Sequence, residues 1–175
     1  TDFDTLNPGC FVNDVVVGFW LLWISRNEFP KSSDVFIFCT FFYTKLLEDG
    51  GEELVSRWCR NKNVDIFSKK IVMFPVNLDL HWSLCCVINL CNINTSCNAT
   101  DSNGNTVPDI PFIIHMDSLG LHCSKTISSN IRNWVMSEWK KRNKDNDDVP
   151  ITVETMPTVN PSGNFLPLQR TCFCL

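Results

Sequence analysis

The sequence has little of several features that would point to a particular class of protein. Its longest apolar run, Val15–Ile24, is far short of the roughly 20 residues that a transmembrane helix needs. No charged segment precedes this run and no small-residue cleavage pattern follows it, so a signal peptide is not expected. There is no excess of basic residues either. The net charge is −4 and the isoelectric point is near 5.3, which argues against nucleic acid or a membrane as a partner.

Cysteine is abundant, but its arrangement lacks the spacing of a metal site. The ten cysteines form no Cys-x-x-Cys pair and no zinc-like pattern with histidine, so we predict no metal and no cofactor. Most of them lie inside apolar runs, where a free thiol behaves as a small hydrophobic group. This favours a reduced, intracellular protein, nuclear or cytoplasmic. Two glycosylation triplets, at Asn94 and Asn98, point the other way, but they fall in an asparagine-rich segment.

Length and pattern predict one α+β domain over residues 1–175. An apolar content of 44% in 175 residues is enough for a sizeable core, and we expect a monomer. Helices are predicted over residues 15–25, as a buried helix capped by Asn13 or Asp14, over 52–60, and after a capping Ser124. Strands are predicted over residues 70–76, 81–90, 111–116 and 151–155. Residues 34–43 fit a strand or a helix, and residues 92–109 form a polar surface loop insertion.

Only three histidines are present, which restricts the choice of a general base. His81 opens an apolar strand directly after a turn, where a side chain can face a cleft. His115 lies within a strand and His122 in a loop. Asp117 ends the strand expected beside that of His81 and can accept its imidazole N–H. Gln169 can donate its amide N–H to a developing oxyanion.

Each of these residues also has an ordinary structural explanation. A single histidine is more often part of the packing than of a catalytic site. Asp117 precedes Ser118-Leu119-Gly120, and aspartate commonly caps such a turn. Gln169 can be a loop residue. The individual residues therefore leave the chemistry open.

Longer stretches of the chain resemble the Ulp/SENP family of SUMO proteases. The resemblance lies in Leu6–Asp14, Phe41–Leu46, Val64–Phe67, Phe74–Asn77, His-Trp-Ser-Leu at 81–84, and Ile114–Leu119, which contains Asp-Ser-Leu. These segments follow the family's order and cover nearly the whole chain. They imply a papain-like α+β cysteine protease fold, in which a helical part packs on a small, mostly antiparallel sheet.

The resemblance also implies roles for particular residues. The base of the family corresponds to His81, the acid that orients it to Asp117, and the oxyanion glutamine to Gln169. Trp82 matches a tryptophan that helps to form a narrow tunnel over the Gly-Gly tail of the substrate. Phe11 and Asp14 are the other expected substrate-binding residues. Phe11 departs from the family, which usually has a second tryptophan there.

The nucleophile is the largest departure from the family pattern. Family members carry Asp-Cys-Gly roughly six residues after the oxyanion glutamine, whereas this chain continues from Gln169 through Cys172 and Cys174 to Leu175. One explanation is a truncated or replaced C-terminus, so that the domain is incomplete and less stable. The other is a relocated nucleophile at Cys172 or Cys174.

Two functions remain open from the sequence. The first is a cysteine protease that matures SUMO, or another ubiquitin-like protein, and removes it from conjugates after Gly-Gly. The second is a catalytically inactive pseudo-protease that binds such a modifier without cleaving it. A third and weaker alternative is a secreted or metal-stabilised cysteine-rich domain.

Overall fold

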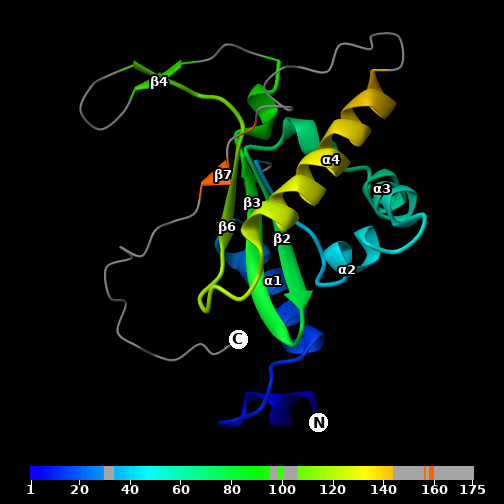
Figure 1. Cartoon of the computed structure of the whole chain (residues 1–175), viewed down its shortest axis with the longest axis vertical. Helices are drawn as coiled ribbons and strands as arrows, with labels where there is room; N and C mark the ends of the chain where they lie inside the picture. Colours follow the sequence, from blue (N-terminus) through cyan, green and yellow to red (C-terminus); the bar gives the residue numbers. More distant parts are fainter. Residues whose placement is uncertain (30–33, 95–97, 101–105, 144–155, 157, 160–175) are drawn as a thin grey trace.

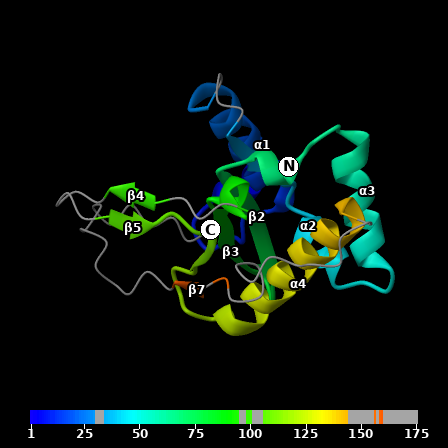
Figure 2. The same ribbon diagram turned by 90° about the horizontal axis from the view of Figure 1, so that it is seen from above.

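The computed structural model describes residues 1–29, 34–94, 98–100, 106–143, 156 and 158–159. They form a central sheet with the long helix α4 (Ser124–Arg142) on one face and α1 (Asp14–Asn27) on the other (Figure 2). Helices α2 (Phe42–Leu46) and α3 (Gly51–Asn61) lie beside the sheet on the α4 side (Figure 1). Three short 3₁₀ helices complete the helical part, at Asp2–Leu6, Ile66–Ser68 and Leu90–Asn92. This is the expected α+β architecture.

The sheet has five strands in the order β1-β2-β3-β6-β7. Its strands are β1 (Val35–Ile37), β2 (Ile71–Leu78), β3 (His81–Ile88), β6 (Phe112–Met116) and β7 (Thr158–Val159). The three longest strands, β2, β3 and β6, are antiparallel neighbours. Each short edge strand is parallel to its neighbour, β1 to β2 and β7 to β6. The pairing of β3 with β6 is the one expected from the sequence, and it brings the start of one strand near the end of the other.

The core lies between α4 and the sheet. Phe38, Phe42 and Phe74 surround the fully buried indole of Trp134, with ring centroids 4.9 to 5.9 Å from it. Trp134 belongs to the predicted periodic face of α4, whose other apolar members are also buried: Ile127, Ile131, Val135 and Trp139. Removing such a tryptophan side chain typically costs about 3–5 kcal/mol. This packing holds the sheet, and the strand ends that it carries, in place.

Helix α1 forms where predicted, but the prediction that it is buried is wrong. The Asn13 side chain accepts a hydrogen bond from the Val16 N–H at 3.0 Å, which caps the helix. Val16 is the only residue of the helix that is buried. Phe19 and Trp20 are 60% and 48% exposed. Among the described residues, no helix is both long and apolar enough to cross a membrane.

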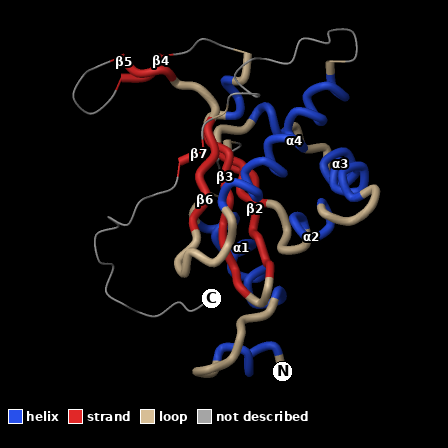
Figure 3. The backbone as a smooth tube through the Cα atoms, viewed as in Figure 1, coloured by secondary structure: helices blue, strands red, loops and turns tan. Residues whose placement is uncertain are grey.

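Three further segments refine the expectations from the sequence. Residues 34–43 contain both candidate structures, since β1 is followed by α2. The insertion at residues 92–109 is not entirely loop, because β4 (Asn98–Thr100) and β5 (Thr106–Pro108) pair as a small antiparallel sheet that projects from the body (Figure 3). Ser124 does not cap α4; Cys123 holds the cap position and Ser124 is the first helical residue. The strand predicted at residues 151–155 lies outside the described residues.

Candidate active site

A tight turn and a strand end bring His81 and Asp117 together. Leu78 and His81 are paired across β2 and β3, so only Asp79 and Leu80 form the turn, and both have positive φ, at 50° and 61°, as in a type I′ hairpin. Asp117 directly follows the last residue of β6. The His81 Nε2 atom lies 2.6 Å from Asp117 Oδ1, and the two side chains are only 5% and 6% exposed.

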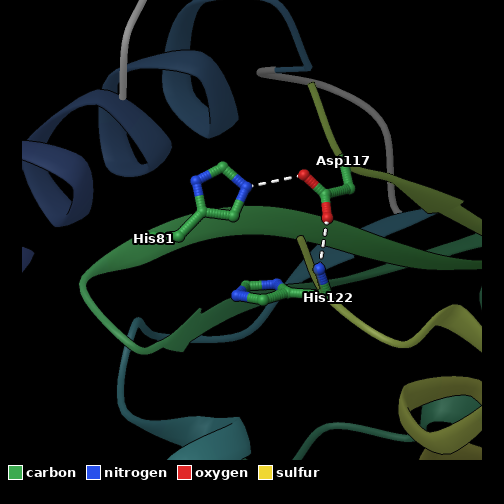
Figure 4. Close-up of side chains that lie close together, drawn as sticks. All are labelled: His81, Asp117 and His122. Atoms are coloured by element: carbon green, nitrogen blue, oxygen red, sulfur yellow. Dashed lines mark hydrogen bonds and ion pairs between the residues drawn. The ribbon is translucent and has the colours of Figure 1, made fainter. Parts of the chain in front are cut away.

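The Asp117 carboxylate is held by four N–H groups. Figure 4 shows the bond from the His81 ring and the bond from the backbone N–H of His122, which donates to Oδ2 at 2.8 Å. In addition, the backbone N–H groups of Leu119 and Gly120 donate to Oδ1, at 3.1 and 3.0 Å. Burial alone would raise the pKa of Asp117, but the bonds from the His122 N–H, the His81 ring and the turn outweigh it and lower the pKa well below its usual range. Asp117 therefore both caps the turn and orients His81.

This arrangement fixes the tautomer of His81. An ionised carboxylate can only accept hydrogen bonds, so Nε2 carries the proton and donates it to Asp117. In the neutral ring the Nδ1 atom is then a lone-pair acceptor, and no described residue is hydrogen-bonded to it. A neutral imidazole with one nitrogen anchored and the other available can remove a proton from a thiol.

The chain preceding α1 lies against the residue after His81. The Trp82 indole N–H donates to the carbonyl oxygen of Val12 at 2.9 Å, and Trp82 is buried. Phe11, next to Val12, is 68% exposed, and Asp14 lies half-buried in the first turn of α1. The three expected substrate-binding residues, Phe11, Asp14 and Trp82, thus come from segments joined by this bond.

A second polar group beside His81 was missed by the sequence reasoning. Ser83 Oγ bonds both His115 Nε2 and His122 Nδ1, at 2.9 and 2.7 Å. Ser83 and His115 are buried, and this burial lowers the pKa of His115. A signal was available, because His81 and Ser83 are two residues apart on one strand, and His115 and Asp117 are two apart along the next. Such spacing places side chains on the same face of a sheet.

The cluster also offers atoms that could bind a metal ion. One nitrogen or oxygen from each of His81, Asp117 and His122 lies within 4.8 Å of the others. However, both nitrogens of His122 already have partners, since Nδ1 bonds Ser83 and Nε2 bonds the Leu78 carbonyl oxygen. Metal binding would break these bonds, so the arrangement suits proton transfer better than metal coordination.

The other expected catalytic residues cannot be placed. Gln169, Cys172 and Cys174 all lie outside the described residues. The cysteines within the described part of the chain are free thiols. The described residues thus provide a histidine and the carboxylate that orients it, and both candidate nucleophiles lie outside them.

Comparison with known proteins places this geometry in a family. Residues 11–162 match the model of the Ulp1 protease family, C-terminal catalytic domain. The chain is 31% identical over 160 residues to "Probable ubiquitin-like-specific protease 2B" of Arabidopsis thaliana, which covers 84% of this chain and 16% of that protein. It is also 31% identical over 189 residues to "Ubiquitin-like-specific protease 1C" of the same organism, covering 98% of this chain and 30% of that protein. The chain therefore spans less than a third of either relative.

Solved structures give the same assignment. A structure described as "Crystal structure of the de-sumoylating protease" superimposes with a TM-score of 0.69 at 25% identity, covering 91% of this chain and 56% of that one. The Ulp1 protease domain in complex with Smt3, the yeast orthologue of SUMO, has the same fold, with a TM-score of 0.60 at 24% identity over 91% of this chain and 60% of that one. Together with the His81–Asp117 pair at the ends of adjacent strands, these matches show that the chain belongs to the Ulp1 family of cysteine proteases.

Proposed function

We propose that this chain is part of a cysteine protease that cleaves the bond after the C-terminal Gly-Gly of SUMO or another ubiquitin-like protein. The observation that carries the proposal is the 2.6 Å contact between His81 Nε2 and Asp117 Oδ1, in two side chains that are almost completely buried. In a family of cysteine proteases, this pair is the base and the acid that orients it. The family model and the two relatives named as ubiquitin-like-specific proteases support the substrate class.

The proposed reaction uses the free nitrogen of His81. Its Nδ1 atom removes the proton from a cysteine thiol, and the thiolate attacks the carbonyl carbon of the terminal glycine. Gln169 donates an N–H to the oxyanion. His81 then returns the proton to the leaving amine, and water hydrolyses the thioester to release the modifier and regenerate the thiol. Asp117 stabilises the imidazolium that exists between the two proton transfers.

The substrate tail is proposed to pass beside Trp82. The bond from its indole to the Val12 carbonyl oxygen fixes the ring. We propose that Trp82 and the neighbouring Phe11 form the walls of a passage that admits only glycine, because a Cβ would collide with the aromatic rings. Asp14 is proposed to contact the modifier. We further propose a monomer that acts in the nucleus or cytoplasm, a setting supported by the free thiols of the described cysteines, three of which are buried: Cys59, Cys85 and Cys86.

The direct test uses SUMO that carries a C-terminal vinyl sulfone, which forms a thioether with an activated thiol. We expect an adduct on the full chain, and peptide mass spectrometry identifies the cysteine that carries it. Cys172→Ser and Cys174→Ser distinguish the two candidate nucleophiles. His81→Gln should abolish labelling without abolishing binding of unmodified SUMO.

The absence of any adduct would overturn catalysis by this chain. Binding of SUMO without an adduct would instead establish the inactive binding protein. A control variant, Ser128→Ala, changes a buried serine of α4 whose hydroxyl has no partner among the described residues, and it should leave labelling unchanged.

A further inference from the structure

Two of the three histidines of the chain, His115 and His122, belong to one connected hydrogen-bond network. Ser124 Oγ lies 2.7 Å from His115 Nδ1, and Ser83 Oγ bridges His115 and His122. At the far end, His122 Nε2 lies 3.1 Å from the carbonyl oxygen of Leu78. The network therefore joins the first turn of α4 to the end of β2.

The hydrogen bonds of this network have one consistent assignment of donors and acceptors. A carbonyl oxygen only accepts, so Nε2 of His122 must donate to Leu78, and in the neutral ring Nδ1 is then an acceptor. Ser83 therefore donates its single proton to His122, which leaves its oxygen to accept from His115 Nε2–H. The remaining nitrogen of His115, Nδ1, accepts the hydroxyl proton of Ser124. Every donor in the network has an acceptor, and no ring needs a charge.

His122 connects this network to the catalytic pair at three points. Its ring meets that of His81 at an angle of 62°, with the centroids 4.8 Å apart. Its backbone N–H donates to Asp117 Oδ2. Its Nε2–H holds the carbonyl oxygen of Leu78, the residue paired with His81 across the β2–β3 turn. Movement of His122 would therefore affect the His81 ring, the Asp117 carboxylate and the β2–β3 turn at the same time.

On the basis of the proposed function, we propose that His122 is a positioning residue for the His81–Asp117 pair. The hydrogen-bond chain from Ser124 through His115 and Ser83 holds its ring as the neutral Nε2–H tautomer, in contact with His81. A neutral ring at this place provides packing without putting a second positive charge beside the imidazolium that His81 forms during the reaction. Ser83 and His115 then act through His122 and do not touch the substrate.

Long-range ¹H–¹⁵N correlation spectra of the full ¹⁵N-labelled chain test this directly, because only three histidines contribute. At pH 8 we expect each ring to be a single Nε2–H tautomer, whereas a free imidazole populates both. The short bond to Asp117 should place the His81 Nε2 proton far downfield, and Asp117→Asn should remove that signal and assign it. If His122 or His115 of the wild-type protein carried its proton on Nδ1, the proposed direction of hydrogen-bond donation would be wrong.

Variants of the two serines test the coupling to His81. Ser83→Ala should broaden or remove the downfield His81 signal and mix the tautomers of His122, while Ser83→Thr, which keeps the hydroxyl, should restore both. Ser124→Ala, a milder change at the far end, should mix the tautomers of His115. Ser128→Ala is the matched control, because Ser128 is a buried serine of the same helix whose hydroxyl has no partner among the described residues.

An unchanged His81 signal in folded Ser83→Ala would overturn the positioning role. Where the protease activity is present, His122→Phe should lower kcat more than tenfold with little change in KM, because it disturbs the base and not the binding surface; an effect on KM alone would also count against the proposal. The spectra require no substrate. Failure of the proposed protease activity would therefore leave the spectral result intact, and the two outcomes can be told apart.

Discussion

At the scale of single residues, the main feature of the site is that one carboxylate, that of Asp117, accepts hydrogen bonds from several N–H groups. Asp117 takes four N–H donors on two oxygens, and it is nearly excluded from solvent. A carboxylate with this many donors is stabilised in its charged form. The same residue therefore orders the turn that follows β6 and also keeps His81 in one orientation, so that capping the turn does not exclude orienting the histidine.

Replacing Asp117 with Asn should destabilise the fold in a pH-dependent way. The lowered pKa of Asp117 means that its charge stabilises the folded state above the unfolded value of about 3.9, and that this contribution is lost as the pH falls below it. We expect a loss of about 2 kcal/mol at pH 7, shrinking below pH 4. Urea unfolding of both proteins at pH 7, 5 and 3 measures this difference, and a constant difference would contradict it.

A second residue with a distinctive environment is Cys123, at the N-terminus of α4. The Thr126 hydroxyl donates to its sulfur at 3.2 Å, and this bond, with the backbone N–H groups of the first turn and the nearby Lys125, lowers the pKa of the exposed thiol. By contrast, burial raises the pKa of Cys86 to about 12.

Iodoacetamide should therefore alkylate Cys123 well before Cys86 at pH 7. Peptide mass spectrometry of timed samples gives the rate at each site. Thr126→Val keeps the side-chain shape and removes the hydroxyl, so it should slow alkylation of Cys123 and shift its pH dependence upward. Equal rates in the two proteins would show that the hydroxyl does not stabilise the thiolate.

At the scale of secondary-structure elements, the connection between α2 and α3 depends on a close backbone approach. A Cβ added at Gly51 would lie 1.9 Å from the carbonyl oxygen of Lys45, a distance that no rearrangement of a side chain can relieve. Gly18, within α1, would meet nothing within 4 Å. Substitution by alanine can therefore be compared at a crowded glycine, Gly51, and at an uncrowded one, Gly18.

Gly51→Ala should lower the free energy of unfolding by about 2 kcal/mol or more. Gly18→Ala should raise it by about 0.5–1 kcal/mol, because alanine favours the helix interior. Urea denaturation measures both changes. A neutral effect at Gly51 would mean that α2 and α3 can separate at little cost.

The elements that the sequence predicts well are those whose side chains repeat with a clear period. The buried face of α4 follows the helical period, and β2 and β3 are continuous apolar runs bounded by turns. Residues 34–43 remained undecided because β1 and α2 are each too short for a period to show. The hydroxyl of Ser124 was assigned to a cap because its actual partner, His115, lies on another element, and long-range pairing is not visible in a local pattern.

Part of the site could also be predicted from the sequence. His81 and Asp117 could be paired because each lies at the end of a strand whose neighbour was foreseeable. The spacing along β3 and β6 could have indicated Ser83 and His115, but the position of His122 depends on where the loop after β6 folds back, which no local pattern shows. Burial of α1 was predicted wrongly, because apolar composition does not reveal whether a second surface is present to cover it.

At the scale of the whole molecule, apolar side chains are divided unequally between the two faces of the sheet. The α4 face encloses the aromatic core around Trp134. On the other side, three aromatic rings on α1 meet edge to face: Phe19 and Trp20 have centroids 6.0 Å apart, and Trp20 and Trp23 5.6 Å apart. All three are more than 40% exposed. An exposed apolar cluster of this kind can bind apolar dyes.

The chain should therefore bind the dye ANS in its folded state, mainly through α1. The double variant Phe19→Gln/Trp23→Gln removes two exposed rings without changing the net charge, and it should lower ANS fluorescence several-fold. Because these rings bury little area, the free energy of unfolding should change by less than about 1 kcal/mol. Leu47→Gln is the control, since Leu47 is 51% exposed next to α2, and it should leave the fluorescence unchanged. Undiminished ANS binding in the double variant would place the apolar surface elsewhere, whereas a large loss of stability would show that α1 packs more tightly in solution than its exposed rings imply.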